Sequence, residues 1–311
     1  MPGSQDYAAD PRNESVLVHL NGALVPRGEA RVSIFDAGFV LGDGVWEGLR
    51  LHRSGLLFLD PHLDRLFAGA GAISLDIGLS RDAIVGALRA TLAANAMQDG
   101  VHIRLMVTRG EKKTPNQDPR NALGRPTIAI VAEYKEPGRE ARARGLSLFT
   151  SAIRCTPADM FDMRLNSHSR LNLVIALTQA IAAGADEALM LDPNGFVSSC
   201  NATNLFFVSR GAVCTSTGAY CFHGITRANV MALCRRHAIP LRIGDFTLHD
   251  VYGADEAFVT GTFGGIMAVR AIDGRALAMA PPGGLTQRLH ALYQNLKDEE
   301  AAADIARVGA S

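Results

Sequence analysis

The sequence predicts an α+β fold in two domains, and three observations support this. Short runs rich in β-branched and aromatic residues alternate with polar residues and end at Asn or Gly turns, which is typical of strands in hairpins. Longer stretches repeat apolar residues at helical spacing. The chain has 311 residues, 48% of them hydrophobic, which is enough for two buried cores.

A break at Glu136-Pro137-Gly138 marks the expected boundary between the domains. Met1 to Glu14 is polar and lacks the apolar segment of a secretory signal, so we expect a disordered tail there. The predicted organisation is a tail at 1–14, an N-terminal α/β domain at 15–135, a linker at 136–140 and a C-terminal α/β domain at 141–311.

The N-terminal half favours hairpins followed by helices and strands. Asn21-Gly22 and Ser54-Gly55 have the composition of hairpin turns, and Ser80 can cap a helix. A polar loop at Gly110–Gly124 is long enough to indicate a functional role. The expected elements are hairpins at Val16–Leu24 and at Val45–His52 with Leu56–Leu59, helices at His62–Ile73 and Arg81–Asn95, and strands at His102–Thr108 and Thr127–Ala132.

The C-terminal half favours a helix, then strands, then two further helices. Gly184 can end the first helix, and Asp192-Pro193-Asn194-Gly195 is a turn by composition. The expected elements are helices at Leu171–Ala183, Thr226–His237 and Thr286–Leu296, and strands at Glu187–Leu191, Phe196–Ser198 and Asn204–Val208.

Composition excludes several classes of protein. The formal net charge is zero, so nucleic acid is not an expected partner. No run approaches 18 apolar residues, so we expect no membrane partner. The cysteines form no Cys-x-x-Cys pair, which argues against a metal site and favours a reduced, cytoplasmic, soluble protein. They are Cys155, Cys200, Cys214, Cys221 and Cys234.

Three segments carry residues suited to binding a phosphate. Gly224-Ile225-Thr226-Arg227 opens a helix after a loop, and free N–H groups at a helix N-terminus favour an anion. Thr260-Gly261-Thr262 is a Gly/Thr turn. Arg65, in His62-Leu63-Asp64-Arg65-Leu66, has a guanidinium that matches phosphate oxygens, although it could be an ordinary surface Arg.

With these segments, the stretch Ala183–Gly195 and the stretch Phe196–Phe206 make the chain resemble class IV (fold-type IV) pyridoxal-phosphate-dependent aminotransferases from about Val18 to Ile272. That family includes branched-chain and D-amino-acid aminotransferases and aminodeoxychorismate lyase. The resemblance implies the two-domain D-amino-acid aminotransferase-like fold, and amino acid and 2-oxo acid substrates. It also implies a homodimer with pyridoxal or pyridoxamine phosphate as cofactor.

The resemblance implies a role for each matching residue. The phosphate contacts of the family fall on Arg65, Gly224, Ile225, Thr226, Gly261 and Thr262. Trp46 stands where the family has an aromatic in the substrate pocket, although a core Trp is the alternative. Arg104 lies on a strand that lines the substrate side, and we expect it to contact an anion.

Two positions depart from the family pattern. Counting back from Glu187 without gaps places Asn166 on the lysine that binds the cofactor covalently, and an amide cannot form an imine. Ser199 stands where the family has the Glu that keeps the pyridine nitrogen protonated. We therefore expect a cofactor held without a covalent bond and weakened stabilisation of a carbanion. The remaining lysines, Lys112, Lys113, Lys135 and Lys297, lie away from this position in the family register.

One residue near Asn166 could take over the proton transfer of the missing lysine, and another could bind the substrate. His168 could act as a base, because imidazole moves protons near neutral pH, or it could only hold the loop. Arg170 stands where branched-chain members usually have Tyr, and it could bind a substrate carboxylate or pair with an acid.

Three functions remain open from the sequence. The first is an atypical branched-chain-like aminotransferase, slow or inactive as an ordinary transaminase. The second is a lyase related to aminodeoxychorismate lyase, a resemblance to which Cys200 contributes. The third is a protein that binds another phosphorylated ligand or acts as a non-catalytic partner.

Overall fold

A computed structural model describes residues 3–277 and 284–309. The chain divides into two compact units. The C-terminal unit contains residues 1–8, 137–164 and 171–297, and the N-terminal unit contains residues 9–136, 165–170 and 298–311. This division differs from the continuous boundaries predicted above, because three short segments join the unit that is remote in sequence: 1–8, 165–170 and 298–311. Residues 1–2 of the expected tail lie outside the described residues.

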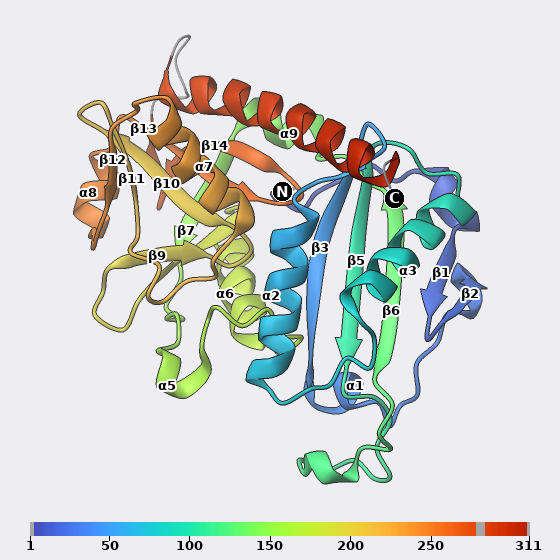
Figure 1. Cartoon of the computed structure of the whole chain (residues 1–311). Coiled ribbons are helices and arrows are strands. Elements are labelled where there is room, and N and C mark those ends of the chain that lie inside the picture. Colours follow the sequence, from blue (N-terminus) through green and yellow to red (C-terminus); the bar gives the residue numbers. More distant parts are fainter. Residues whose placement is uncertain (1–2, 278–283, 310–311) are drawn as a thin grey trace. The chain divides into compact units, whose positions relative to one another are not determined.

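The N-terminal unit is built on an antiparallel sheet in the order β2-β1-β6-β5-β3-β4. Helices α2 and α3 cover one face of it (Figure 1). The strands are β1 (Leu17–Leu20), β2 (Ala23–Pro26), β3 (Gly44–His52), β4 (Gly55–Leu56), β5 (Val101–Thr108) and β6 (Thr127–Tyr134). The helices are η1 (Pro11–Ser15), η2 (Arg27–Glu29), α1 (Ala37–Leu41), α2 (Leu59–Ala72), α3 (Arg81–Ala94) and η3 (Pro119–Asn121).

Side-chain alternation gives this sheet two different faces. Leu49, Ile103 and Ile130 point to the helix-covered face and are fully buried in the core. Trp46 pairs with Met106, and Arg50 pairs with His102, on the other face of the same strands. The sheet therefore separates an apolar core from a face that is rich in basic and aromatic residues.

The segment 165–170 belongs to this unit because it adds to the edge of β3. Strand β4 pairs only with Leu51 and His52, which leaves the beginning of β3 unpaired on that side. The N–H of Trp46 donates to Asn166 O at 3.0 Å, and the N–H of His168 donates to Gly44 O at 3.0 Å. Backbone pairing thus fixes the position of the segment that the family resemblance marks as catalytic.

The end of the expected disordered tail is ordered against the sheet. Asn13 is 8% exposed, its Nδ2 donates to Tyr134 O at 2.8 Å, and its Oδ1 accepts from Tyr134 N at 2.8 Å. Helix η1 begins at Pro11 with Asp10 as its cap. A side chain that satisfies both backbone groups of one strand residue holds this segment in place, so residues near 13 differ from the prediction.

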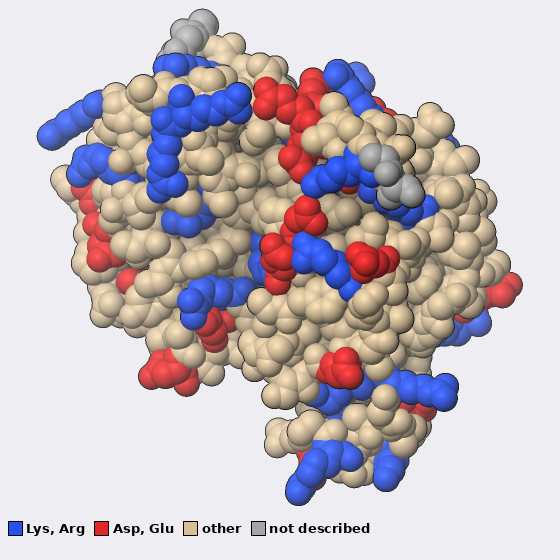
Figure 2. Space-filling view, in the orientation of Figure 1, with Lys and Arg blue, Asp and Glu red and all other residues tan. Residues whose placement is uncertain are grey.

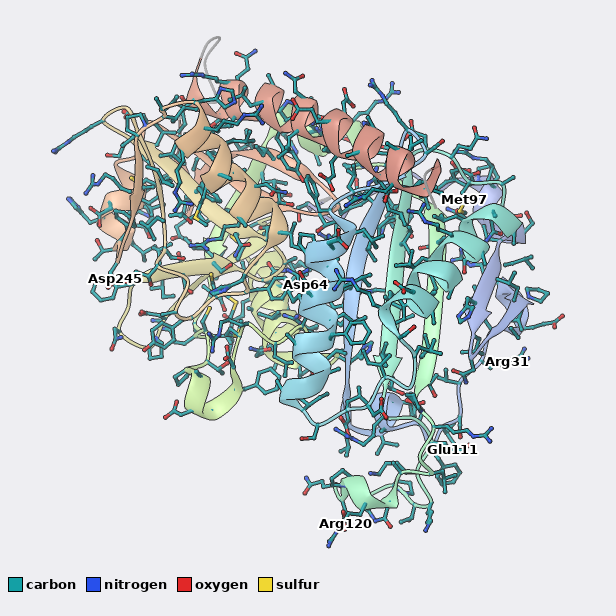
Figure 3. All side chains as sticks on the ribbon, in the orientation of Figure 1. Arg31, Asp64, Met97, Glu111, Arg120 and Asp245 are labelled. Carbon is teal, nitrogen blue, oxygen red and sulfur yellow. The ribbon has the colours of Figure 1, made fainter. Side chains whose placement is uncertain are left out.

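The loop at 110–124 is folded on itself rather than open. Lys112 N donates to Phe35 O, and the Lys112 Nζ donates to Asp118 O at 2.8 Å. Figure 3 shows Glu111 near the base of this loop and Arg120 near its tip. The buried Lys112 side chain, which is 2% exposed, therefore stabilises the loop.

The C-terminal unit is built on a mixed sheet in the order β12-β11-β10-β13-β14-β7-β8-β9, with β15 paired to β14. Helix α6 packs on β7 and β8, and α7 packs on β12 and β13. The strands are β7 (Leu146–Thr150), β8 (Glu187–Leu191), β9 (Val197–Cys200), β10 (Asn204–Ser209), β11 (Ala212–Thr215), β12 (Leu241–Ile243), β13 (Glu256–Gly261), β14 (Gly265–Ile272) and β15 (Arg275–Ala276). The helices are α4 (Arg139–Arg144), α5 (Ala158–Phe161), α6 (Leu171–Ala182), α7 (Ile225–Arg236), α8 (Leu248–Tyr252) and α9 (Leu285–Gly309), of which α9 continues into the N-terminal unit.

Charged side chains on the surface over α2 and α3 are interspersed, as Figure 2 shows. Arg81 pairs with Asp60 at 3.0 Å and with Asp64 at 2.5 Å. Within the described ranges, no helix combines the length and the hydropathy that a membrane crossing requires.

Candidate functional site

A buried carboxylate organises the polar cluster of the N-terminal unit. Glu47 on β3 is fully buried, and its two oxygens accept from Arg65 Nε at 2.7 Å and Arg65 Nη2 at 2.6 Å. His62 Nδ1 lies 2.6 Å from Glu47 Oε2. Burial alone would raise the pKa of Glu47, but the hydrogen bonds from Arg65 and His62 outweigh it and lower that pKa. The predicted phosphate ligand Arg65 is therefore held by a carboxylate in its own unit.

Asn166, which the sequence analysis expects at the family lysine position, is bound into this cluster. Its side chain donates from Nδ2 to Trp46 O and, at 3.3 Å, to Glu47 Oε1. Its Oδ1 accepts from Arg170 Nη2. The residue is 3% exposed. The side-chain amide thus acts as a structural connector between β3 and Arg170, and it offers no nucleophile.

Two guanidinium groups lie near the ring of Trp46. Its Nε1 donates to Ser167 O at 3.0 Å, which fixes the ring. The Arg104 Cζ lies 3.6 Å from the ring centroid, and the Arg170 Cζ lies 5.7 Å from it. Burial, followed by the charges of Arg104 and Arg65, lowers the pKa of Arg170 to about 10, so it remains charged at neutral pH. The three predicted substrate residues are brought together.

His168 lies beside this group. Burial, followed by the charge of Arg104, lowers the pKa of His168 to about 4, although a backbone hydrogen bond to Val45 acts in the opposite direction. Its Nε2 is buried and has no hydrogen-bond partner among the residues that the structure describes. The imidazole is therefore neutral at pH 7. Its Nε2, unpaired within the described residues, could accept a proton as a base does, but its basicity is low.

One of the remaining lysines is electrostatically coupled to this face. Burial lowers the pKa of Lys135, and the charges of Arg104 and Arg50 lower it further against the opposing effect of Glu133. The family register placed Lys135 away from the site, yet the charge of the predicted substrate residue Arg104 acts on its pKa.

The predicted phosphate residues of the C-terminal unit form a second cluster. Gly224 is the N-cap of α7 and has no side chain to cap it, so within the described part of the chain the first amides of the helix receive no capping bond from this position. A Cβ on Gly224 would lie 2.3 Å from Asn204 Oδ1, so only glycine allows this approach. Gly261 pairs with Gly265 across the turn that contains Thr262.

Ser199 lies on β9 in the same unit. Its Oγ donates to Thr203 O at 2.8 Å and accepts from Asn204 Nδ2 at 3.1 Å. A Cβ on Gly261 would lie 3.4 Å from Thr203 Cγ2, so Ser199 and the Thr262 turn are linked through Thr203. We call this set the phosphate cup: Ser199, Gly224, Ile225, Thr226, Gly261 and Thr262. Its free helix amides and hydroxyls suit a phosphate, while its Ser199 proton is committed to a backbone carbonyl.

Sequence reasoning missed a buried acid beside the phosphate cup. Glu187 on β8 accepts from Thr203 Oγ1 at 2.6 Å. Burial raises the pKa of Glu187 to about 7 against the hydrogen bond from Thr203. The available signal is an acidic residue, Glu187, at the start of a predicted buried strand.

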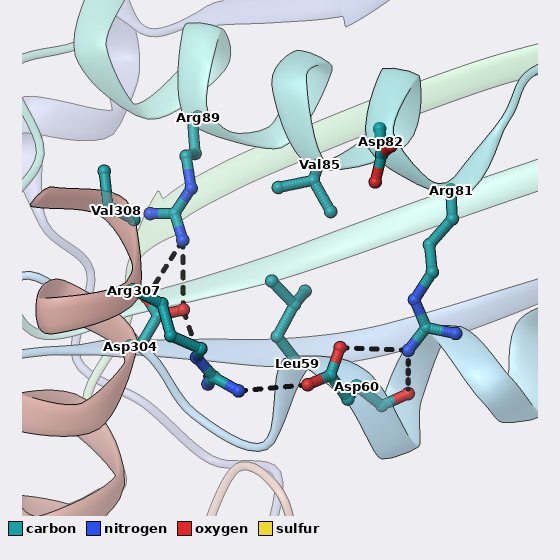
Figure 4. A pocket seen from close by; sticks show the side chains of 9 residues that line it. All are labelled: Leu59, Asp60, Arg81, Asp82, Val85, Arg89, Asp304, Arg307 and Val308. Atoms are coloured by element: carbon teal, nitrogen blue, oxygen red, sulfur yellow. Dashed lines mark hydrogen bonds and ion pairs between the residues drawn. The ribbon is translucent and has the colours of Figure 1, made fainter. Parts of the chain in front are cut away.

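A surface hollow of about 230 Å³ lies over α2, α3 and the end of α9 in the N-terminal unit (Figure 4). Its charged side chains pair with one another, for example Arg89 with Asp304 at 3.0 Å and Arg307 with Asp60 at 3.0 Å. None of the predicted site residues lines it.

Comparison with known proteins matches residues 44–272 to the model of the family "Amino-transferase class IV". Branched-chain-amino-acid aminotransferase-like protein 2 of Arabidopsis thaliana is 37% identical over 93% of this chain and 51% of its own length, so the chain spans about half of that relative. Among solved structures, the branched-chain aminotransferase of the archaeon Thermoproteus uzoniensis with norvaline is 29% identical, with a TM-score of 0.83 over 92% of this chain and 96% of its own. Another similar structure, also of a branched-chain amino acid aminotransferase, was solved with pyridoxamine 5'-phosphate.

A 4-amino-4-deoxychorismate lyase from Pseudomonas aeruginosa is also similar, at 28% identity and a TM-score of 0.75 over 90% of this chain and 98% of its own. These likenesses agree with the fold that the sequence predicts. The chain belongs to the class IV aminotransferase family, whose members depend on pyridoxal phosphate and share the α+β, fold-type IV architecture.

Proposed function

We propose that this protein binds pyridoxal or pyridoxamine phosphate without a covalent bond and acts on an amino acid or 2-oxo acid, with little ordinary transaminase turnover. One observation carries the proposal: the side chain of Asn166 is buried and hydrogen-bonded to Trp46, Glu47 and Arg170. No amine stands at the position where the family binds its cofactor covalently. The retained groups of the phosphate cup support binding of the phosphate.

The cofactor, when bound, supplies an electron sink to the carbon that loses its proton. Thr226, Thr262 and the amides at the start of α7 would hold its phosphate. Ser199 stands at the family position for the ring nitrogen, but its proton points to Thr203 O, so it does not protonate that nitrogen. We therefore infer weak carbanion stabilisation and slow chemistry.

For substrate binding we propose Trp46, Arg104 and Arg170. The indole ring is fixed by Ser167, and the charges of Arg104 and Arg170 flank it. Such a pair suits the carboxylate of an amino acid or 2-oxo acid. His168, neutral and with its Nε2 unpaired within the described part of the chain, is the proposed proton acceptor.

We propose a homodimer because each unit exposes apolar side chains in one stretch. In the N-terminal unit, Ile34 is 69% and Phe39 is 71% exposed. In the C-terminal unit, Leu171 is 71% and Val174 is 55% exposed on α6. Burial of such patches against a second copy would be favourable. Light scattering of the purified protein tests this, and a monomer at micromolar concentration would contradict it.

The first experiment is an absorption titration with pyridoxal phosphate and with pyridoxamine phosphate, followed by borohydride reduction and mass spectrometry. We expect saturable binding of both forms and no covalent adduct. The variant Asn166→Lys is the positive control, because it restores an amine and should give a reducible adduct.

A reducible adduct in the unchanged protein would overturn the proposal, and peptide mapping would show whether Lys135 carries it. Absence of binding by either form would instead favour another phosphorylated ligand in the phosphate cup.

Lyase activity is the second candidate, favoured by the likeness to 4-amino-4-deoxychorismate lyase. A lyase would release a 2-oxo acid from its substrate without any amino-group acceptor. A transaminase would require that acceptor. Omission of the acceptor from the assay therefore separates the two activities.

A further inference from the structure

The C-terminal helix α9 places one side chain in the phosphate cup. Tyr293, which is 3% exposed, has its Oη 3.3 Å from the Oγ1 of Thr226. Thr226 is itself 3% exposed and lies in the first turn of α7. Two buried hydroxyls therefore share a hydrogen bond at the position proposed for the phosphate.

The ring of Tyr293 also lies against the second half of the phosphate cup. A Cβ on Gly265 would lie 3.5 Å from the Tyr293 Cε1, an ordinary contact distance, so the ring lies next to this glycine. Gly265 has a φ of +66° and pairs with Gly261 at the turn that carries Thr262. Tyr293 thus contacts both segments that supply phosphate ligands.

The start of α9 is fixed by a buried carboxylate. Glu256, which is 6% exposed, accepts from Leu285 N at 3.0 Å and Thr286 N at 2.9 Å through its two oxygens. Tyr293 follows Leu285 by two turns of helix, so the anchor holds its hydroxyl at a defined distance from β13.

We propose that Tyr293 is a positioning residue for the phosphate group, acting through Thr226. A threonine hydroxyl has one proton and two acceptor positions. When Tyr293 donates its proton to Thr226 Oγ1, the Thr226 proton is left to donate to a phosphate oxygen. This inference rests on the proposed binding of a phosphate in the cup, and it extends that site to a residue on α9.

The test is the variant Tyr293→Phe, which removes only the hydroxyl and keeps the ring against Gly265. The matched control is Tyr252→Phe, because the Tyr252 hydroxyl donates to Asp273 Oδ2 at 2.7 Å at the far end of β14 from Gly265. The probes are pyridoxal phosphate and pyridoxal, whose dissociation constants are measured by absorption titration.

We expect Tyr293→Phe to raise the dissociation constant for pyridoxal phosphate about five- to tenfold, as loss of one hydrogen bond does, and to leave that for pyridoxal unchanged. Tyr252→Phe should change neither constant. An equal loss for both probes would show a general loosening of the site and would overturn the inference. So would a Tyr293→Phe variant that binds both probes like the unchanged protein.

A mutant cycle with Thr226 tests the route of the effect. In a Thr226→Val background, Tyr293→Phe should change binding of pyridoxal phosphate by less than about twofold, because the intermediary hydroxyl is gone. In a Thr226→Ser background, which keeps the hydroxyl, the five- to tenfold loss should persist. Equal losses in both backgrounds would show that Tyr293 does not act through Thr226.

The unchanged protein separates this inference from the proposed function. If it binds pyridoxal phosphate no more tightly than pyridoxal, the phosphate cup and the role of Tyr293 both fail. If it prefers pyridoxal phosphate and Tyr293→Phe has the same preference, only the role of Tyr293 fails.

Discussion

At the scale of single residues, the proposed function rests on the phosphate cup and on Asn166 at the expected lysine position. Asn166 does not leave a gap where the lysine would stand, because its amide bonds to Trp46, Glu47 and Arg170. A buried amide with all these partners is costly to disturb. The Asn166 side chain therefore has a structural role of its own, whatever chemistry the site performs.

His168 gives a prediction for stability in acid. The pKa of His168 falls from the ordinary 6.5 to about 4 in the folded protein, chiefly through burial. Between those values the unfolded chain binds the proton and the folded chain does not, so stability decreases as pH falls from 6.5 to 4. His168→Gln removes this loss, which amounts to at most about 3 kcal/mol. Urea unfolding at pH 7 and pH 4.5 measures it.

The exposed His249, changed to Gln, is the control for that experiment. It should lose stability in acid as the unchanged protein does. If His168→Gln and the unchanged protein lose the same stability between pH 7 and pH 4.5, then the imidazole of His168 is not shielded as the structure indicates.

Glu187 gives the opposite dependence on pH. Burial raises the pKa of Glu187 from 4.5 to about 7, so the folded protein keeps a proton that the unfolded chain loses. Stability therefore decreases as pH rises through the window from 4.5 to 7 and stays lower above it. Glu187→Gln keeps an acceptor for Thr203 and should be more stable than the unchanged protein at pH 8, by at most about 3 kcal/mol.

Guanidinium or urea unfolding of Glu187→Gln at pH 5 and pH 8 measures this difference. The exposed Glu140, changed to Gln, provides the comparison. Its free energy of unfolding should differ from that of the unchanged protein by less than about 0.5 kcal/mol at either pH. A Glu187→Gln variant that is less stable than the unchanged protein at pH 8 would argue that the carboxylate is needed in its charged form.

At the scale of elements, local chemistry explains the helices and hairpins that the sequence predicts. Asn21 and Gly22 both have positive φ, at 51° and 92°, in the turn between β1 and β2. Ser80 accepts from Ala83 N as the cap of α3, and Gly184 ends α6 with a φ of +75°. Each of these devices needs only a few neighbouring residues, so the expected hairpin, helix start and helix end are confirmed.

Other elements escaped prediction for physical reasons. Strand β13 is buried almost throughout, so it lacks the alternation that identifies a strand with one exposed face. Helices α1, α5 and α8 are five residues or shorter, less than two turns, and show no helical period. Helix α9 extends to Gly309, well past the predicted end at Leu296. The prediction stops there because the charged run 297–300 interrupts the apolar spacing.

The cap of α9 gives a prediction at this scale. Glu256→Ala would leave the N–H groups of Leu285 and Thr286 without their buried acceptor, and should cost about 2 kcal/mol of stability. Glu256→Gln keeps one acceptor oxygen and should cost about half as much. Urea unfolding of both variants checks this order. A Glu256→Ala protein as stable as Glu256→Gln would show that the carboxylate does not anchor the helix.

At the scale of the whole molecule, each unit has its own sheet, core and cluster of site residues. Trp46, Arg65, Arg104, Asn166, His168 and Arg170 gather in the N-terminal unit. Ser199, Gly224, Ile225, Thr226, Gly261 and Thr262 gather in the C-terminal unit. The predicted boundaries placed Asn166, His168 and Arg170 in the C-terminal domain, and only the structure shows that they belong with the N-terminal unit.

The sequence by itself determined the family and the α+β class, because these depend on residue type and spacing along the chain. Only the tertiary structure decided that Glu47 holds Arg65, that 165–170 pairs with β3, that Ser199 donates to Thr203, and that Tyr293 meets Thr226. Asn166 and Trp46 are 120 residues apart, as Thr226 and Tyr293 are 67 apart. A pattern reports local conformation and buried faces, whereas the partner of a buried polar group is chosen by packing between distant segments.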